Sequence, residues 1–345
     1  MQTAAISPER IGDAVDHLVT APISNWTILK GLPLARLYAA ARELAGGPVT
    51  LAAARLLQEN VTRGDRVLVL SGFIMRDYGL PETDGPIGAA VLARALSLGL
   101  GAVPVGVSED SIVPCMDACF SAAGLIPADL DRLDSGRHRY CLSGFPVDED
   151  AAVRAARELI ERHRPKALVS VERPGAGKDG HYHGGGGFEI SSFTAKTDIL
   201  FEEARKAGVA TIGVGDLGNE LGMGAVADVV ASDVPLGDVI AARQKADVTV
   251  VANISNWGAY GIAACLAALT GNSDAFHDGE HEKRLIEACV RAGAIDPVGG
   301  QRRLYVDGTD AHTNASLVDL LRSIVDLSQR EGANISGYQN SWQAK

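Results

Sequence analysis

The fold is decided by residues 209–224, VATIGVGDLGNELGMG, where an apolar run stops abruptly at glycines and acidic side chains. The uninterrupted β-branched character of residues 209–214 is typical of a strand that is buried on both faces of a parallel sheet. Comparable runs occur at residues 66–71 (RVLVLS), 102–107, 166–171 (KALVSV) and 247–253 (DVTVVAN). These segments predict the strands of one sheet.

Helical stretches separate the predicted strands. We expect helices at about residues 85–100, 148–163, 197–207, 258–269, 280–292 and 314–330, and a short strand at 304–306. The alternation predicts an α/β fold with a mostly parallel, doubly wound, Rossmann-like sheet and helices on both of its faces. We expect residues 1–64 to form a helical N-terminal segment and residues 65–345 to form the α/β domain, with a possible lobe boundary near residue 145.

The composition excludes several classes of protein. The chain has 345 residues and a net charge of −11, and it lacks the basic patches that bind nucleic acid. No stretch reaches the roughly 18 to 20 apolar residues that span a bilayer, and the N-terminus does not resemble a secretory signal. The sequence therefore predicts a cytoplasmic protein with no nucleic-acid or membrane partner.

Five cysteines are scattered along the chain. Cys115 and Cys119 would share one face of a helix, which is compatible with a metal pair or a redox pair. We favour the simpler interpretation, in which the cysteines are small side chains packed in a reduced core.

Acidic side chains follow several of the predicted strands. Ligands of open parallel sheets bind beyond the carboxyl ends of the strands, so these side chains should gather at one edge. Carboxylates that converge in this way must lose charge or bind a cation, and oxygen ligands suit Mg²⁺ or Mn²⁺. The predicted metal ligands are Glu82, Asp84, Glu172, Asp216 and Glu220. The alternative is that each one caps the following helix, and Asp84 fits that alternative well.

The segment from Gly213 to Gly218 also matches the dinucleotide-binding pattern G-x-G-x-x-G in outline. Asp216 and Glu220, however, would place negative charge where a pyrophosphate should lie. We therefore expect no NAD.

A glycine-rich loop supplies the remaining candidates. His181 and His183 precede four consecutive glycines, so either histidine could move a proton in a site that a mobile lid covers. We assign catalysis to these histidines together with Glu172 and Asp216. Basic side chains in this region could bind a substrate carboxylate, and polar side chains at other strand ends could bind the rest of the substrate. The predicted substrate-binding residues are Arg173, Lys178, Lys196, Asn219, Ser255, Asn256 and Trp257.

Four segments closely resemble, in order, the motifs of the D-glutamate cyclase-like C-terminal domain family. They are PETDGPIGAAVLARAL (81–96), VERPGAGKDGHY (171–182), TIGVGDLGNELGMG (211–224) and ISNWGAYGIAACLAAL (254–269). The resemblance covers roughly residues 65–310. It implies an α/β fold and a role in amino-acid lactam chemistry, the interconversion of D-glutamate and 5-oxo-D-proline.

Together these observations predict a metal-assisted lyase or cyclase that acts on a small carboxylated amino acid or lactam. One alternative is a hydrolase or isomerase of a small cyclic amide. Another is a nucleotide-binding or regulatory module without its own catalysis. The apolar character of residues 23–57 also predicts a homodimer.

Overall fold

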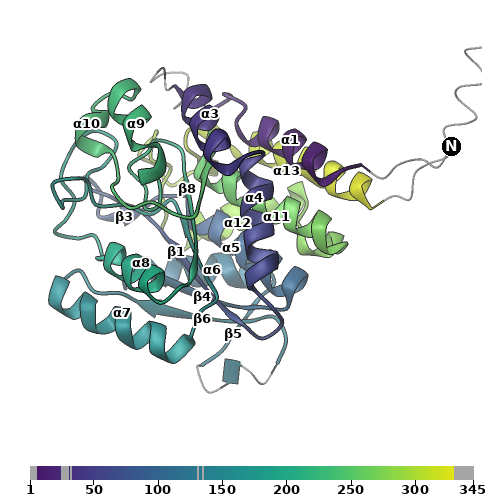
Figure 1. Ribbon diagram of the computed structural model, residues 1–345, viewed down its shortest axis with the longest axis horizontal. Helices are drawn as coiled ribbons and strands as arrows, with labels where there is room; N and C mark the ends of the chain where they lie inside the picture. Colours follow the sequence, from purple (N-terminus) through teal and green to yellow (C-terminus); the bar gives the residue numbers. More distant parts are fainter. Residues whose placement is uncertain (1–5, 25–30, 32, 130–131, 134–135, 330–345) are drawn as a thin grey trace, which may run out of the picture.

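One parallel sheet organises the molecule (Figure 1). The computed structural model describes residues 6–24, 31, 33–129, 132–133 and 136–329. The strand order is β5-β6-β4-β1-β7-β8-β9, and every neighbouring pair is parallel. The strands are β1 (Arg66–Ser71), β4 (Val103–Ser108), β5 (Ile126–Pro127), β6 (Arg139–Gly144), β7 (Ala167–Val171), β8 (Ala210–Gly215) and β9 (Val248–Val251). The prediction of a mostly parallel, doubly wound sheet is confirmed.

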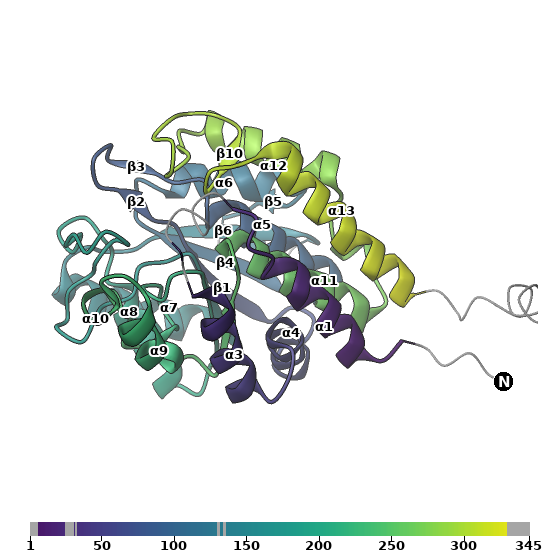
Figure 2. The same ribbon diagram turned by 90° about the horizontal axis from the view of Figure 1, so that it is seen from above.

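Different helices pack against the two faces of the sheet (Figure 2). Leu68 and Leu70 of β1 point into a core closed by α7 (Glu149–His163) and α8 (Thr197–Lys206). Val67 and Val69 point into the larger core on the opposite face. Because side chains alternate along a strand, an apolar run such as RVLVLS can serve both cores.

The larger core is built around α11 (Ser255–Thr270), whose residues are buried from Ser255 to Ala267. The helices that close this side of the sheet are α1 (Pro8–Val19), α3 (Leu34–Ala45), α4 (Val49–Asn60), α5 (Pro86–Ala95), α6 (Val113–Ala122), α12 (Gly279–Arg291) and α13 (Ala311–Ser328). In Figure 1, α1 and α13 lie side by side, so the first and last described helices share this core.

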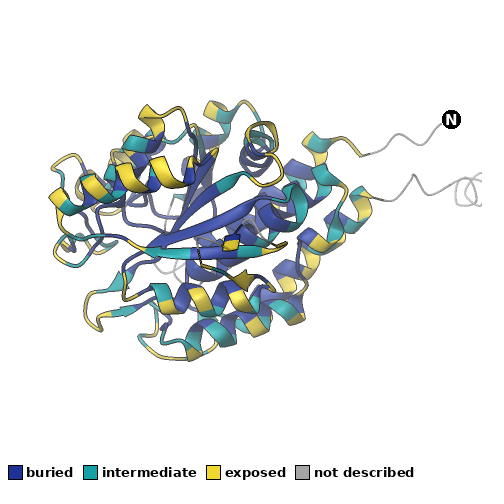
Figure 3. Cartoon of the chain, turned by 90° about the horizontal axis from the view of Figure 1, so that it is seen from below, coloured by how far each residue is buried: buried dark blue, intermediate teal, exposed yellow. Residues whose placement is uncertain are grey.

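The outward faces of the helices are exposed and the strands between them are buried (Figure 3). The remaining short elements are β2 (Ile74–Met75), β3 (Leu80–Pro81), a π-helical turn (Leu96–Leu100), η3 (Gly224–Val226), α9 (Ala227–Asp233), α10 (Gly237–Ile240), η4 (Ser273–Ala275), β10 (Tyr305–Val306) and β11 (Thr309–Asp310). The β2–β3 and β10–β11 hairpins are antiparallel.

The sequence analysis did not predict β5 or β6. Strand β6 (RYCLSG) is only partly buried, because it lies near the edge of the sheet and its outer neighbour β5 is two residues long. Such a strand lacks the continuous apolar run that marks the central strands. The N-terminal helices α1, α3 and α4 pack into the larger core, and the predicted boundary between residues 64 and 65 stays a prediction.

Candidate active site

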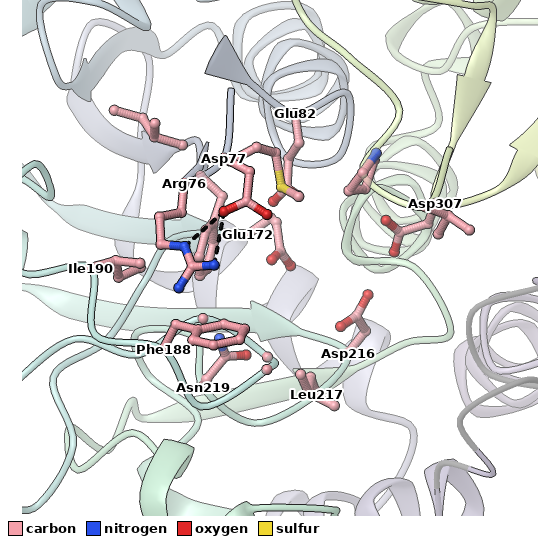
Figure 4. A pocket seen from close by; sticks show the side chains of 18 residues that line it. Arg76, Asp77, Glu82, Glu172, Phe188, Ile190, Asp216, Leu217, Asn219 and Asp307 are labelled. Carbon is pink, nitrogen blue, oxygen red and sulfur yellow. Dashed lines mark hydrogen bonds and ion pairs between the residues drawn. The ribbon is translucent and has the colours of Figure 1, made fainter. Parts of the chain in front are cut away.

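A cavity of about 240 Å³ opens beyond the carboxyl ends of the central strands (Figure 4). Its acidic lining comes from Asp77, Glu82, Glu172, Asp216 and Asp307, and its apolar lining includes Phe73, Phe188 and Leu217. The position is the one expected for a ligand site in an open parallel sheet. The volume suits a molecule of amino-acid size.

Four carboxyl groups converge inside this cavity. Figure 4 shows the side chains of Glu82, Glu172, Asp216 and Asp307 directed toward one another. All four residues are at most 8% exposed. Glu172 follows β7 and Asp216 follows β8, while Asp307 reaches the same space from the turn between β10 and β11. We call these four residues the carboxylate cluster.

Two overlapping groups of three acidic residues have carboxylate oxygens close enough to bind one cation. Ligand oxygens of Asp84, Asp216 and Asp307 lie within 4.8 Å of one another, and so do those of Glu172, Asp216 and Glu220. Asp216 belongs to both sets. Oxygen donors at this spacing can hold a hard divalent ion.

Burial raises the pKa of each carboxyl in the cluster well above its usual value, and repulsion from neighbouring carboxylates adds to the shift. Burial also raises the pKa of Asp84 to about 7, although the N–H groups of Asn256, Ser255 and Gly85 oppose the shift. The charged groups that shift the pKa values of these four carboxyls most strongly are all other carboxylates. Their electrostatic environment therefore favours protonation or a bound cation.

The backbone is unusual at two of these residues. Glu172 has φ 42° and Asp307 has φ 49°, a region that non-glycine residues rarely occupy. Asp307 and Gly308 (φ 72°) form the two-residue turn of the β10–β11 hairpin, for which Asp-Gly is a favoured sequence. Strained backbone of this kind is common where a side chain must be aimed at a ligand.

Glu220 fills the loop of the G-x-G-x-x-G segment with its own side chain. Its carboxylate accepts hydrogen bonds from the backbone N–H groups of Asp216 (3.0 Å), Leu217 (2.9 Å) and Gly218 (2.7 Å). These amides are the donors that such a loop offers to a pyrophosphate. An internal carboxylate occupies that position and orders the loop that carries Asp216.

Asp84 and Asn256 cap each other's helices. The Asp84 carboxylate accepts from the backbone N–H groups of Ser255 (3.0 Å) and Asn256 (2.8 Å), which open α11. The Asn256 side-chain oxygen accepts from Gly85 (2.9 Å) and Gly88 (2.6 Å) at the start of α5. Asp84 therefore caps a helix, as in the alternative interpretation. The helix is α11, however, which is distant in sequence from Asp84.

The three predicted substrate-binding residues at the start of α11 do not line the cavity. Asn256 is a cap, and the indole N–H of Trp257 donates to the side chain of Asn314 (2.8 Å). Ser255 lies behind the carboxylate cluster, where its hydroxyl donates to Glu172 (2.5 Å). Asn219 does line the cavity, and its amide donates to the backbone carbonyl of His183 (3.0 Å).

The histidines and lysines of the glycine-rich region lie outside the residues that line this cavity, and the roles predicted for them stay predictions. His181 is exposed and pairs with Glu189 (3.0 Å), and Lys178 is exposed. His183 is buried beside Asp179 (3.7 Å). Lys196 donates its ammonium hydrogens to the backbone carbonyls of Ser191 (2.5 Å) and Thr194 (2.9 Å). Of this region, the backbone of Gly184 to Gly186 and the Phe188 ring reach the cavity.

Arg173 also lies outside the residues that line the cavity. Its guanidinium is fully buried and forms a bidentate ion pair with Glu109. The remaining donors bind the carbonyls of Gly72 and Ala195 and the hydroxyl of Thr197, each at 3.0 Å. No guanidinium hydrogen is left for a substrate carboxylate, because an arginine has five donors in total. Arg173 instead ties the ends of β1 and β4 to the segment before α8.

The sequence analysis did not single out several of the residues that line the cavity, among them Asp307 and Arg76. Asp307 lies far along the chain from the other acids, but the Asp-Gly dipeptide between two short strands was a usable signal. Arg76 lies at the tip of the β2–β3 hairpin. Its guanidinium contacts Asp77 (2.8 Å) and stacks on the Phe188 ring at 3.8 Å from the centroid. It is the only Lys or Arg among the cavity-lining residues of the described chain.

The raised pKa values predict how stability depends on pH when no metal is bound. Carboxyls with a pKa near 4 in the unfolded chain keep their protons to higher pH in the folded chain, so this stabilisation is complete below about pH 4. The stabilisation is lost as pH rises through the pKa values that these carboxyls have in the folded chain. The pKa of Asp84 in the folded chain is about 7. The loss is about 1.4 kcal/mol per pH unit for each retained proton. The melting temperature of the chelator-treated protein should therefore fall between about pH 5.5 and pH 8. A melting temperature that rose across this interval would contradict the assignment.

An α/β protein with a buried acidic pocket at the carboxyl edge of its sheet is the class that the fold and site define. A family model described as D-glutamate cyclase-like, C-terminal, matches residues 35–322, and the chain belongs to this family. Over 103 residues the chain is 44% identical to human mitochondrial D-glutamate cyclase. That alignment covers 30% of this chain and 17% of the human protein.

None of the described helices is both long enough and apolar enough to cross a bilayer.

Proposed function

We propose that this protein is a metal-assisted lyase or cyclase that interconverts a glutamate-type amino acid and its lactam, as D-glutamate and 5-oxo-D-proline. The observation that carries the proposal is the buried carboxylate cluster in a cavity of amino-acid size. The family and the similarity to a D-glutamate cyclase support the substrate class.

The residues present fit a hard divalent cation. Buried carboxylate oxygens at mutual distances within 4.8 Å provide the oxygen donors that Mg²⁺ and Mn²⁺ prefer. Asp216 would hold the ion together with Asp84 and Asp307, or together with Glu172. A bound ion would supply Lewis acidity to a substrate carbonyl or carboxyl oxygen. Glu220 would contribute less directly to metal binding, since its carboxylate oxygens already accept hydrogen bonds from three backbone N–H groups of the loop.

The chain's own residues can bind and orient a small carboxylate. Arg76 is the cationic group at the cavity and would pair with the carboxylate that does not react. The rings of Phe73 and Phe188 and the side chain of Leu217 line the cavity beside it and would reduce the access of water. The acidic interior and the cationic rim would thus fix the direction in which a glutamate-like molecule enters.

Glu82 is our candidate for moving the proton, in place of the two histidines. Burial raises its pKa well above the ordinary value, which favours the protonated form that a general acid needs. In ring closure the substrate amine forms a bond to the side-chain carboxyl carbon and one carbon–oxygen bond breaks. Glu82 would donate a proton to the departing hydroxyl and accept one from the amine, so that water is the only other product. Ring opening with water reverses these steps, so a cyclic-amide hydrolase would use the same residues.

Turnover of D-glutamate and 5-oxo-D-proline, measured with Mn²⁺ and again after chelation, tests the proposal. We expect activity that depends on the metal. In Arg76→Gln, KM for the carboxylated substrate should rise about tenfold or more, since a charge-assisted pair is lost, while kcat changes less. The matched control is Arg162→Gln, which removes an exposed arginine from α7. Equal KM values in the two variants would contradict the role of Arg76. Absence of turnover combined with ligand-induced stabilisation would favour a regulatory module.

Two finer predictions stay open. A cytoplasmic location stays a prediction, and the human relative is named as mitochondrial. The homodimer also stays a prediction. The apolar side chains of α3 and α4 that motivated it are largely buried within the chain itself, with Leu37 and Leu57 completely so. Residues 25–30 and 32 of that segment lie outside the described chain.

A further inference from the structure

A second cluster of metal-ligating side chains lies in the larger core, between α6 and α12, which pack side by side (Figure 2). Cys115 and Cys119 come from consecutive turns of α6 and Cys289 comes from α12. The three sulfurs lie within 4.8 Å of one another, and the Sγ atoms of Cys115 and Cys289 are 3.5 Å apart. All three residues are at most 1% exposed.

The sulfur triangle has the size that a thiolate-bound metal requires. Metal–sulfur bonds of about 2.3 Å place the three sulfurs of a trigonal site roughly 4 Å apart. The Cys115–Cys289 separation of 3.5 Å is slightly below this value and no pair is more than 4.8 Å apart, so an ion could lie among the sulfurs with only small side-chain adjustments. Within the described residues, the cluster contains no fourth ligand of the His, Cys, Asp or Glu type. Three sulfur ligands without a fourth suit a soft ion of low coordination number better than they suit tetrahedral Zn²⁺.

We propose that Cys115, Cys119 and Cys289 form a binding site for one soft monovalent d¹⁰ cation, of which Cu⁺ is the biological example. The site is separate from the carboxylate cluster in both position and chemistry, because soft sulfur and hard oxygen ligands select different ions. It would join α6 to α12 across 174 residues of sequence.

The test uses the reduced, full-length protein without oxygen. Cu⁺ is supplied from a complex with a coloured competing chelator, and Ag⁺ serves as a probe that does not change its oxidation state. We expect one ion per chain, sulfur-to-metal charge-transfer absorption in the ultraviolet, and a higher melting temperature. Cys289→Ser should weaken binding at least tenfold. Cys141→Ser and Cys265→Ala are matched controls, since they remove buried cysteines outside the cluster, and both should bind as the unmodified protein does.

Three results would overturn the proposal. They are no binding of either ion by the unmodified protein, equal binding by Cys289→Ser, and tighter binding of Zn²⁺ than of Cu⁺. Circular dichroism establishes whether Cys289→Ser is folded. If it is not, Cys119→Ala, which keeps the Cys115–Cys289 contact, replaces it and should also bind at least tenfold more weakly.

Discussion

Asp216→Asn is expected to lower kcat by about 100-fold or more, which corresponds to ~2.7 kcal/mol of transition-state stabilisation. The Asp216 side chain lines the cavity and belongs to both groups of potential metal ligands. Asparagine keeps the shape of the side chain and removes its charge. The melting temperature of the metal-free variant should stay constant or rise, because one of several mutually repelling carboxyls is gone.

The matched control is Asp228→Asn, which makes the same chemical change at an exposed position in α9. Steady-state kinetics and thermal denaturation of both variants decide the matter. Full activity in Asp216→Asn would remove this residue from the site. A large loss of stability with proportionate loss of activity would assign it a structural role instead.

Glu109→Gln is expected to produce the largest loss of stability, about 3–5 kcal/mol in the free energy of unfolding. Burial acts to raise the pKa of Glu109, but the charge and hydrogen bonds of Arg173 outweigh it, so the pKa is lowered. Removing the carboxylate leaves the Arg173 guanidinium buried without a counter-charge, and a guanidinium cannot lose its proton. Urea denaturation measures the effect.

Two further variants make this test specific. Glu109→Gln combined with Arg173→Met should recover part of the lost stability, because no unpaired charge remains. Glu158→Gln, which breaks an exposed ion pair on α7, should change the free energy by less than about 1 kcal/mol. If Glu109→Gln were as stable as Glu158→Gln, the buried pair would have little structural importance.

Local patterns were sufficient to predict the central strands. β1, β7 and β8 are buried from both sides, so their sequences are continuous apolar runs that cannot be mistaken for amphipathic helices. The residues that follow β7 and β8 were predicted for the same reason. Glu172 and Asp216 come directly after such runs and line the cavity as expected.

The remaining features depend on contacts between distant segments. Helix α11 begins at Ser255 rather than near residue 258, because Asp84 caps it from another part of the chain. Arg173 was predicted to bind substrate because its ion pair with Glu109, which follows β4, joins residues that are distant in sequence. Arg76 reaches the cavity through a hairpin whose two strands are each only two residues long. Periodic patterns in the sequence do not predict such contacts between distant segments.

Titration of the chelator-treated protein with Mn²⁺ tests the central claim most directly. Calorimetry and electron paramagnetic resonance at about pH 7.5 measure the stoichiometry and the affinity of binding. The account predicts one Mn²⁺ per chain, tighter binding as pH rises because the ion displaces protons, and loss of binding in Asp216→Asn but not in Asp228→Asn. The account would be contradicted if Mn²⁺ produced neither a heat of binding nor a bound-ion signal, and Mg²⁺ produced no heat of binding either.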